Sequence, residues 1–562
     1  MGRLAVPQST YLLVAAVMVG IGGGYGAIAF RWLIGIEQQF AFSVLRPILG
    51  RALGPAALVA VLAIGGALAA WITARFAPEA RGHGVPEVMA AVALRGGVIR
   101  PRVIAIKALA SATSIGFGGS CGREGPIVQI GSAIGSILGQ LAHAPAPIVR
   151  TLVACGAAAG ISATFNAPIG GVFFASEVIL GDFAPRSFAT IVVSSVLAAV
   201  VSRAYLGNRP SFDANAFVLV SPRELLLYAL LGVVAAIWAW GFVKTLYLFE
   251  DAIDRVKISA ALKGALGFAC VGAIGLFAPQ VLGVGYESMQ HVLDQHVDAS
   301  RALSLAVLKP LATSLTLGAG GSGGVFAPSL FTGAMLGDAL GRVFHSAFPT
   351  WTAPAAAYGL VAMAAVFAAA AEAPITAIMI VFEMSYDYTI ILPLMTATVI
   401  ATILGRRLLN STVYELKLER RGIDWQRVRR PRAIASALVS SIERQPVVVA
   451  LDTEPASDVI ERLHGTDELV VPVIDSNGDL IGIALANELA WSVTHNPSAL
   501  VGRVARPATA TLVSTETVER AADLMANAQV PLLPVVAKGT ARLIAVVTRR
   551  DVLDAYRSST SA

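Results

Sequence analysis

The feature that most constrains the fold of this 562-residue chain is an internal repeat of two glycine-rich segments. Gly118–Pro126 reads GGSCGREGP and Gly320–Pro328 reads GGSGGVFAP, at a spacing of 202 residues. The same spacing pairs Lys107 with Lys309. A fold that satisfies this sequence therefore contains two halves built on one plan.

A second duplicated segment lies downstream of the first. Asn166-Ala-Pro-Ile169 with Glu177 recurs as Glu372-Ala-Pro-Ile375 with Glu383, at a spacing of 206. Hydrophobic residues make up 56% of the chain and charged residues only 14%, a balance typical of membrane proteins. Matching apolar segments interrupted by Gly and Pro in two halves are typical of transport folds with broken helices. We therefore expect a permeation function.

The segments that follow the glycine-rich turns are predicted to be half-helices. Pro126–Leu141 and Pro328–Leu340 are shorter than the ~20 residues of a straight spanning helix, so we expect them to end inside the membrane. Proline suits a first helical turn because its missing N–H has no partner to lose there. Two convergent helix N-termini, each with about half a positive charge, would bind an anion.

Glu124 is an unusual residue for such a helix end. Its carboxylate would compete with a transported anion for the same N–H donors, so we interpret it as a gate. The alternative is a structural pairing with Arg123. Lys107 and Lys309 either raise the local potential for anions or have a structural role, snorkelling at helix ends or binding loop carbonyls. Glu87, Glu177 and Glu383 are expected to accept backbone hydrogen bonds, and Phe173 and Phe174 to pack.

Charge and cysteine usage limit the other function classes. Much of the basic charge follows the last apolar segment, which places the C-terminus in the cytoplasm by the positive-inside rule rather than indicating nucleic-acid binding. These residues are Arg406, Arg407, Lys417, Arg420, Arg421, Arg427, Arg429, Arg430 and Arg432. The three cysteines, Cys121, Cys155 and Cys270, have no CxxC spacing and are expected to be buried packing residues, so we predict no metal site.

The chain turns soluble after the membrane part and contains a second repeat. Val471-Pro-Val473 with Leu480–Ile483 is answered by Leu533-Pro-Val535 with Leu543–Val546. Alternating β-branched runs and helical stretches predict two small α+β modules.

The quoted membrane motifs resemble those of the CLC family of chloride channels and proton-coupled anion exchangers. The resemblance rests on Gly82-His-Gly-Val-Pro-Glu87, Gly122-Arg-Glu-Gly-Pro126, Gly324-Val-Phe-Ala-Pro328 and Tyr414. It implies an α-helical polytopic membrane protein with an inverted internal repeat and broken helices, and the soluble modules that follow resemble an α+β CBS pair. It also implies a homodimer with one pore per subunit. The gating residue would be Glu124, and the anion would be bound at His83, Gly125, Val325, Phe326 and Tyr414.

Two positions depart from the family pattern. His83 stands where chloride-selective members usually have serine, so chloride preference does not follow from this motif; its side chain could donate to an anion or point aside. Val178 stands where exchangers typically have an internal glutamate. We therefore predict a gated, passive anion channel, with a proton-coupled chloride or anion exchanger as the alternative. A divalent-cation transporter and an enzyme fit less well, because neither clustered acids nor a nucleophile–base set is apparent.

The resemblance also predicts the organisation of the whole chain. Residues 1–420 form the membrane domain, with halves at about 10–207 and 222–406, and residues 421–439 form a linker. The CBS modules span 440–493 and 500–557, where Thr548 and Asp551 match a pattern that contacts an adenine nucleotide; the alternative is a purely structural pair. We expect a multi-pass protein of the cell (inner) membrane with cytoplasmic termini and no required cofactor.

Overall fold

The structure is a computed structural model that describes residues 8–561 except 209, 213–216, 424–436, 467 and 529. The chain divides into two compact units, Met1–Ile423 and Asp424–Ala562. Part of the predicted linker, residues 424–436 with four of the basic residues named above, lies outside the described residues.

The first unit is helical and repeats one order of elements. Its first half contains α1 Gln8–Gln39, α2 Arg46–Leu53, α3 Ala57–Phe76, α4 Val85–Leu94, α5 Arg102–Gly116, α6 Glu124–Leu141, α7 Ala146–Phe165, α8 Pro168–Phe174 and α9 Pro185–Leu206. Its second half contains α10 Glu224–Arg255, α11 Ala260–Phe277, α12 Tyr286–Leu293, α13 Ala299–Gly318, α14 Phe326–Ala347, α15 Ala355–Ala371, α16 Pro374–Ser385 and α17 Ile391–Leu408. The short α18, Glu415–Glu419, follows. Six helical segments among the described residues are long and apolar enough to cross a membrane.

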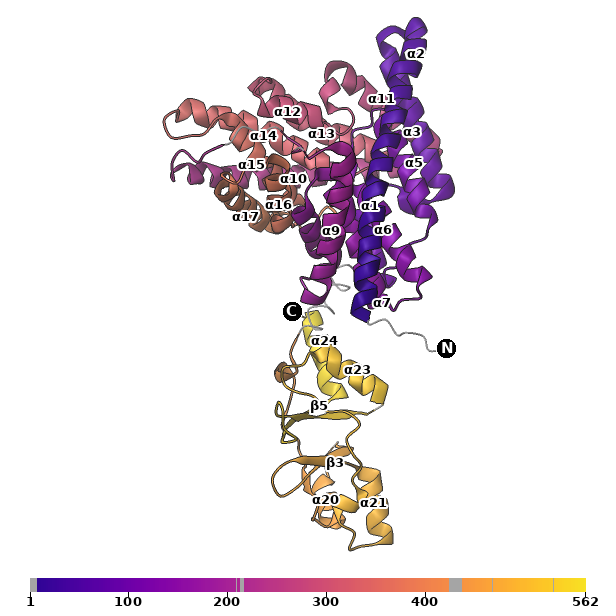
Figure 1. Cartoon of the computed structure of the whole chain (residues 1–562), viewed down its shortest axis with the longest axis vertical. Coiled ribbons are helices and arrows are strands. Elements are labelled where there is room, and N and C mark those ends of the chain that lie inside the picture. Colours follow the sequence, from indigo (N-terminus) through magenta and orange to yellow (C-terminus); the bar gives the residue numbers. More distant parts are fainter. Residues whose placement is uncertain are drawn as a thin grey trace. The chain divides into compact units, whose positions relative to one another are not determined.

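The packing of the two halves follows the same plan. In the first half α1 lies against α7 and α9 (Figure 1), and in the second half α10 lies against α15 and α17 in the same way. Likewise α6 packs on α7 as α14 packs on α15. The sequence repeat is therefore a structural repeat.

Hydrogen bonds between equivalent residues relate the halves by a local two-fold axis. Gly122 N donates to Gly324 O at 2.8 Å, and Gly324 N donates to Gly122 O at 2.6 Å, in an antiparallel bridge. These glycines are 202 residues apart, so each pairs with its own repeat equivalent. Equivalent segments run in opposite directions here, as an inverted repeat requires.

Two sequence expectations about this unit were wrong in detail. Helix α14 has 22 residues and continues beyond Leu340 to Ala347, so it is not a short half-helix, whereas α6 has 18. Its buried face is maintained along α15, which gives the extra turns apolar contacts. Cys121 and Cys155 are buried, but Cys270 is exposed, because it lies on the face of α11 that is not covered by α3.

The second unit contains two α+β modules. The first consists of β1 Ala450–Leu451, α20 Ala456–Leu463, β2 Val470–Ile474, β3 Leu480–Leu485, α21 Ala486–His495 and α22 Val501–Val504. The second consists of α23 Val518–Ala528, β4 Leu532–Val536, β5 Leu543–Thr548 and α24 Arg549–Ser561. In each module two strands pair antiparallel around the repeated proline, with Pro472 opposite Ile483 and Pro534 opposite Val546.

Candidate anion-binding site

Two helix N-termini meet at the Gly122–Gly324 bridge. Arg123 is the N-cap residue of α6 and Val325 is that of α14, each directly after a bridging glycine. The first N–H groups of a helix have no partner within the helix and carry partial positive charge. The bridge thus directs two sets of amide donors at one place.

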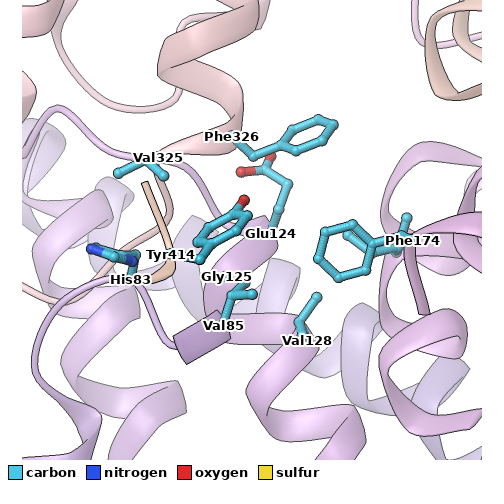
Figure 2. Close-up of a pocket in the computed structure, with 10 residues that line it drawn as sticks. His83, Val85, Glu124, Gly125, Val128, Phe174, Val325, Phe326 and Tyr414 are labelled. Atoms are coloured by element: carbon cyan, nitrogen blue, oxygen red, sulfur yellow. The ribbon is translucent and has the colours of Figure 1, made fainter. Parts of the chain in front are cut away.

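A narrow pocket lies at these helix ends (Figure 2). Its lining includes all six residues that the sequence assigned to the gate and the anion, together with four apolar side chains. The ten residues are His83, Val85, Glu124, Gly125, Val128, Ile161, Phe174, Val325, Phe326 and Tyr414. Phe174 was expected only to pack, but here it lines the pocket; Phe173 instead contacts Phe183 and Phe188.

Glu124 occupies the centre of this arrangement. Its side chain is buried, and Oε1 accepts a 2.7 Å hydrogen bond from the Tyr286 hydroxyl. Oε2 has no hydrogen-bond partner among the described residues, and a Cβ at position 122 would lie only 2.0 Å from it. Only glycine at 122 therefore leaves room for the carboxylate between the two helix ends.

Arg123 does not neutralise Glu124 directly in this structure. Its guanidinium lies over the Tyr286 ring, 4.9 Å from the centroid, and Nη2 donates to the Thr164 carbonyl at 3.4 Å. No ion pair between Arg123 and Glu124 occurs in the described part of the chain. The carboxylate is positioned by a neutral hydroxyl instead.

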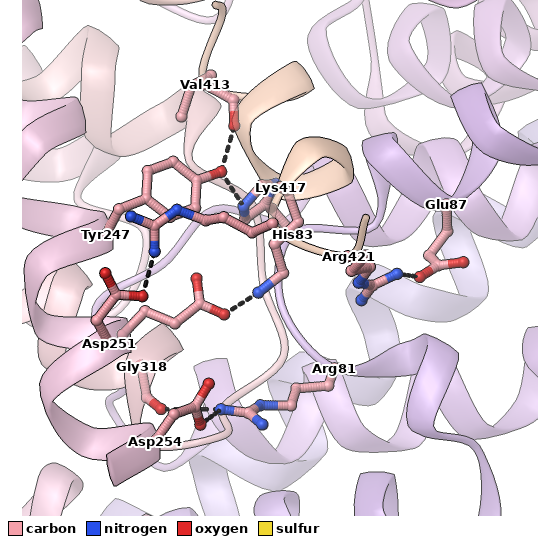
Figure 3. Close-up of polar contacts among 12 residues, drawn as sticks. Arg81, His83, Glu87, Tyr247, Asp251, Asp254, Gly318, Val413, Lys417 and Arg421 are labelled. Atoms are coloured by element: carbon pink, nitrogen blue, oxygen red, sulfur yellow. Dashed lines mark hydrogen bonds and ion pairs between the residues drawn. The ribbon is translucent and has the colours of Figure 1, made fainter. Parts of the chain in front are cut away.

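His83 contributes its backbone and its side chain to different surroundings. A Cβ at position 125 would lie 2.0 Å from the His83 carbonyl oxygen, so the backbone packs tightly on Gly125. The imidazole is buried, with Nε2 3.5 Å from the Tyr247 hydroxyl, which itself donates to Val413 O at 2.5 Å (Figure 3). His83 thus connects the pocket to the polar cluster behind it.

That cluster fixes the segment that carries Tyr414. Tyr414 is the buried N-cap residue of α18, and Figure 2 shows its ring below Glu124. Just beyond it, three ion pairs join this segment to α10 and α4 (Figure 3): Lys417–Glu250, Arg420–Asp251 and Arg421–Glu87. A fourth, Arg81–Asp254, joins the loop before α4 to α10. The expectation for Glu87 was wrong, because its side chain pairs with Arg95 and Arg421 and so joins two elements through charge.

Glu177 and Glu383 accept equivalent backbone hydrogen bonds, each from a helix of the other half. Glu177 accepts bonds from the backbone N–H groups of Ile375 and Thr376, at the start of α16. Glu383 accepts bonds from the equivalent pair at the start of α8, Ile169 and Gly170. Each half therefore caps a helix of the other, as the sequence predicted for these two carboxylates.

Val178 lies beside Glu177 but faces elsewhere. It is buried in the π-helix Ala175–Leu180 and is not part of the pocket lining. The structure thus shows an apolar side chain at the position where family exchangers typically have a glutamate.

The two buried lysines make equivalent contacts in the two halves. Lys107 Nζ donates to Ala80 O and Gly82 O at 2.9 and 2.7 Å, and Lys309 Nζ donates to Val281 O and Gly283 O at 2.9 and 2.8 Å. Of the two interpretations offered for these lysines, the structure supports binding to loop carbonyls.

Tyr286 is a site residue that the sequence analysis missed. A signal was present, because residues 77–85 read APEARGHGV and residues 278–286 read APQVLGVGY, at a spacing of 201. Only four of those nine residues are identical, which is weaker than the glycine-rich repeat. The lysine contacts show that both loops are built alike, and Tyr286 is the equivalent of Val85.

In the second unit, Thr548 and Asp551 lie together at the start of α24. Thr548 N and Oγ1 both donate to Asp551 Oδ2, at 2.7 and 2.6 Å. Arg444 pairs with the same oxygen at 3.2 Å. This carboxylate therefore already stabilises the strand–helix turn.

The fold and site define a membrane protein with a duplicated helical domain, in which paired helix N-termini surround a buried carboxylate. A family model described as "Voltage gated chloride channel" matches residues 65–406, and a CBS domain model matches 439–490 and 501–558. The chain belongs to this chloride channel family, CLC, and carries a CBS pair. It is therefore an integral membrane protein of an anion-transport family.

Curated relatives and solved structures agree with this assignment. A putative chloride channel protein ClcB-like of Ralstonia nicotianae is 32% identical over 74% of this chain and 99% of its own length. An H(+)/Cl(-) exchange transporter ClcA of Salmonella paratyphi B is 31% identical over 72% of this chain and 88% of its own. The crystal structure of a slow cyanobacterial Cl-/H+ antiporter matches with a TM-score of 0.69 at 28% identity, covering 73% of this chain and 97% of that one.

Proposed function

We propose that this protein is a proton-coupled anion exchanger that carries chloride. The observation that carries the proposal is Glu124, buried between two helix N-termini with its carboxylate beside the Gly122–Gly324 bridge. Similarity to a named H(+)/Cl(-) exchange transporter and to an antiporter structure supports exchange over passive flow. The sequence alone favoured the passive channel, and these relatives favour its alternative.

The geometry gives one group both tasks of an exchanger. An ionised Glu124 occupies the place where the free N–H groups of α6 and α14 would bind an anion, so carboxylate and chloride exclude each other. Protonation removes the charge and with it the attraction to the helix ends. Binding of an anion is thereby linked to uptake of a proton by the same side chain.

A passive channel remains the second candidate, because of Val178. Its buried apolar side chain cannot carry a proton. The carboxylate of the neighbouring Glu177 already accepts hydrogen bonds from the N-terminus of α16. In an exchanger the inner part of the proton path would then use water or another group. In a channel, Glu124 would open and close the pathway without stoichiometric proton movement.

Simultaneous anion and proton flux from liposomes distinguishes the two functions. Purified full-length protein is reconstituted, a chloride gradient is imposed without a proton gradient, and potassium with valinomycin sets the voltage to the proton equilibrium potential. Proton movement driven by the chloride gradient is the expected result and establishes exchange. Chloride flux without proton movement would overturn exchange and support the channel.

The same proposal includes a homodimer in the cell membrane with cytoplasmic termini, and one adenine-nucleotide site at Thr548 and Asp551. Cross-linking in the membrane followed by light scattering in detergent would measure the oligomeric state.

The nucleotide site is tested by calorimetric titration with ATP and AMP, in which wild type and Thr548→Val should release different heats of binding. Equal heats from both proteins would leave the purely structural role for the CBS pair.

A further inference from the structure

A loop in the second half places Tyr286 directly against the proposed gate. Tyr286 is the first residue of α12, and its partly buried hydroxyl donates the 2.7 Å hydrogen bond to Glu124 Oε1. We propose that Tyr286 is a positioning residue of the transport cycle, whose hydroxyl holds the ionised Glu124 carboxylate in its blocking place. This inference rests on the proposed role of Glu124.

The loop before Tyr286 is rigidly built. Gly283 and Gly285 have φ of 58° and 95°, and a Cβ on Gly285 would lie 2.6 Å from the Phe331 ring. Lys309 holds the preceding carbonyls of Val281 and Gly283. Because this backbone has one well-defined course, the hydroxyl of Tyr286 is delivered to a fixed position.

The ring of Tyr286 is held as firmly as its backbone. Arg123 lies over one face of it, and its centroid is 6.5 Å from that of Phe165 and 6.0 Å from that of Phe212. These contacts are made by the ring alone, so they survive removal of the hydroxyl. A Tyr286→Phe variant therefore tests the hydrogen bond and leaves the packing in place.

Tyr286 also separates Glu124 from a large cavity. A cavity of about 680 Å³ is lined by Tyr286 and Arg123, and also by two arginines of the first half, Arg31 and Arg46. The equivalent residue Val85 lines the pocket itself, where it presents no polar group. At this position the two similar loops thus differ in chemistry, and the one facing the cavity carries the hydroxyl.

A hydrogen bond to a charged acceptor is stronger than one to a neutral acceptor. The Tyr286 hydroxyl therefore favours the ionised, seated Glu124 over the protonated one. The titratable groups that face Glu124 are Arg123, Cys121, Tyr286, Lys309 and Tyr414. Of these, only Tyr286 makes a hydrogen bond to its side chain in the described structure.

The test compares chloride turnover against pH for five reconstituted proteins: wild type, Tyr286→Phe, Tyr358→Phe, Glu124→Gln, and the double variant Glu124→Gln with Tyr286→Phe. Tyr358 is the matched control, because it is a buried tyrosine that donates to a buried carboxylate, Glu224, at 2.9 Å outside the pocket. We expect Tyr286→Phe to raise turnover at neutral pH about fivefold. Its half-maximal pH should move upward by about 0.7 of a unit, which corresponds to the same factor, and Tyr358→Phe should match wild type.

The double variant separates the two proposals. Tyr286→Phe should add less than about twofold when Glu124 is already glutamine, because no ionised carboxylate remains to be held. If Glu124→Gln raises turnover and Tyr286→Phe alone matches wild type, the positioning role is refuted while the gate stands. If Glu124→Gln itself changes nothing, the proposed function fails first. A fivefold gain from Tyr286→Phe that persists in the double variant would also refute the positioning role.

A second measurement covers the case in which flux is limited by another step. Chloride binding is titrated calorimetrically in detergent at neutral pH. The ionised Glu124 carboxylate and chloride compete for the same site at the helix N-termini. Tyr286→Phe should therefore bind chloride about threefold more tightly than wild type. Unchanged affinity in Tyr286→Phe, together with tighter binding in Glu124→Gln, would overturn the inference.

Discussion

The two halves of the membrane unit differ in charge at the place where their helix ends meet. The first half reads Arg123-Glu124-Gly125 at the helix end, and the second reads Val325-Phe326-Ala327 at the equivalent positions. Around these triplets the halves are alike, with the same bridging glycines, helix starts and prolines. Both halves supply amide donors at the common site, but the first half adds a charge and the second adds an apolar side chain.

This difference separates scaffold from function. Residues that hold backbone in place occur twice, as with the lysines that bind loop carbonyls and the glutamates that cap helices across the halves. Residues with a proposed role in transport occur once. The repeat-equivalent position of Glu124 is occupied by Phe326, and that of Tyr286 by Val85. A duplicated framework thus became asymmetric at the few positions that touch the anion pathway.

The largest expected effect is on the duplicated scaffold. Replacing Lys309 or Lys107 by Met removes the hydrogen bonds of two buried carbonyls, and each change should cost about 2–4 kcal/mol of stability. Thermal unfolding in detergent, followed by size-exclusion chromatography, measures this loss. The exposed Lys244, also on a membrane helix, gives the control Lys244→Met. A loss for one buried lysine only would show that the halves do not share this framework.

The next effect concerns the helix caps contributed by Glu177 and Glu383. Either change to Gln keeps the shape but removes a carboxylate from a helix N-terminus, at a cost of about 1–2 kcal/mol. Both variants should be destabilised alike and should keep the wild-type ratio of protons to chloride. If Glu177→Gln alone abolished proton flux, Glu177 would belong to the proton path. The two glutamates would then share a structural role but not a role in transport.

Glu124→Gln breaks the asymmetry at the common site. Glutamine has no charge to hold between the helix ends, so chloride turnover at neutral pH should rise about tenfold, or ~1.4 kcal/mol, and lose most of its pH dependence. The control is Glu224→Gln, a buried carboxylate bound by Ala353 and Tyr358 outside the pocket. Flux and pH response equal to wild type in Glu124→Gln would remove the gate from the proposal.

The sequence predicted the fold well wherever a residue type has one physical use. Glycine-rich turns before proline located the helix ends, and the motif residues from Glu124 to Tyr414 lie around one pocket. What it could not predict depends on neighbours that are distant in the chain. The length of α14 depends on burial against α15, and the exposure of Cys270 depends on which face α3 covers. Tyr286 reaches Glu124 only through the fold, across 162 residues.

His83 is another single-copy residue of the pocket, with Val284 as its repeat equivalent, and it offers the smallest effect. Its imidazole reaches Tyr247 at 3.5 Å, whereas its carbonyl packs on Gly125, so the backbone forms the pocket and the ring extends behind it. His83→Ser keeps that backbone and should change the chloride-to-nitrate ratio by less than about threefold, or ~0.6 kcal/mol.

The measurement is the flux of each anion from liposomes between pH 6 and 8, with Tyr247→Phe as the matched variant that removes the partner of the ring. If His83→Ser altered selectivity about tenfold and Tyr247→Phe did not, the imidazole itself would contact the anion. The first half would then contribute a second polar side chain at the pathway, in addition to Glu124.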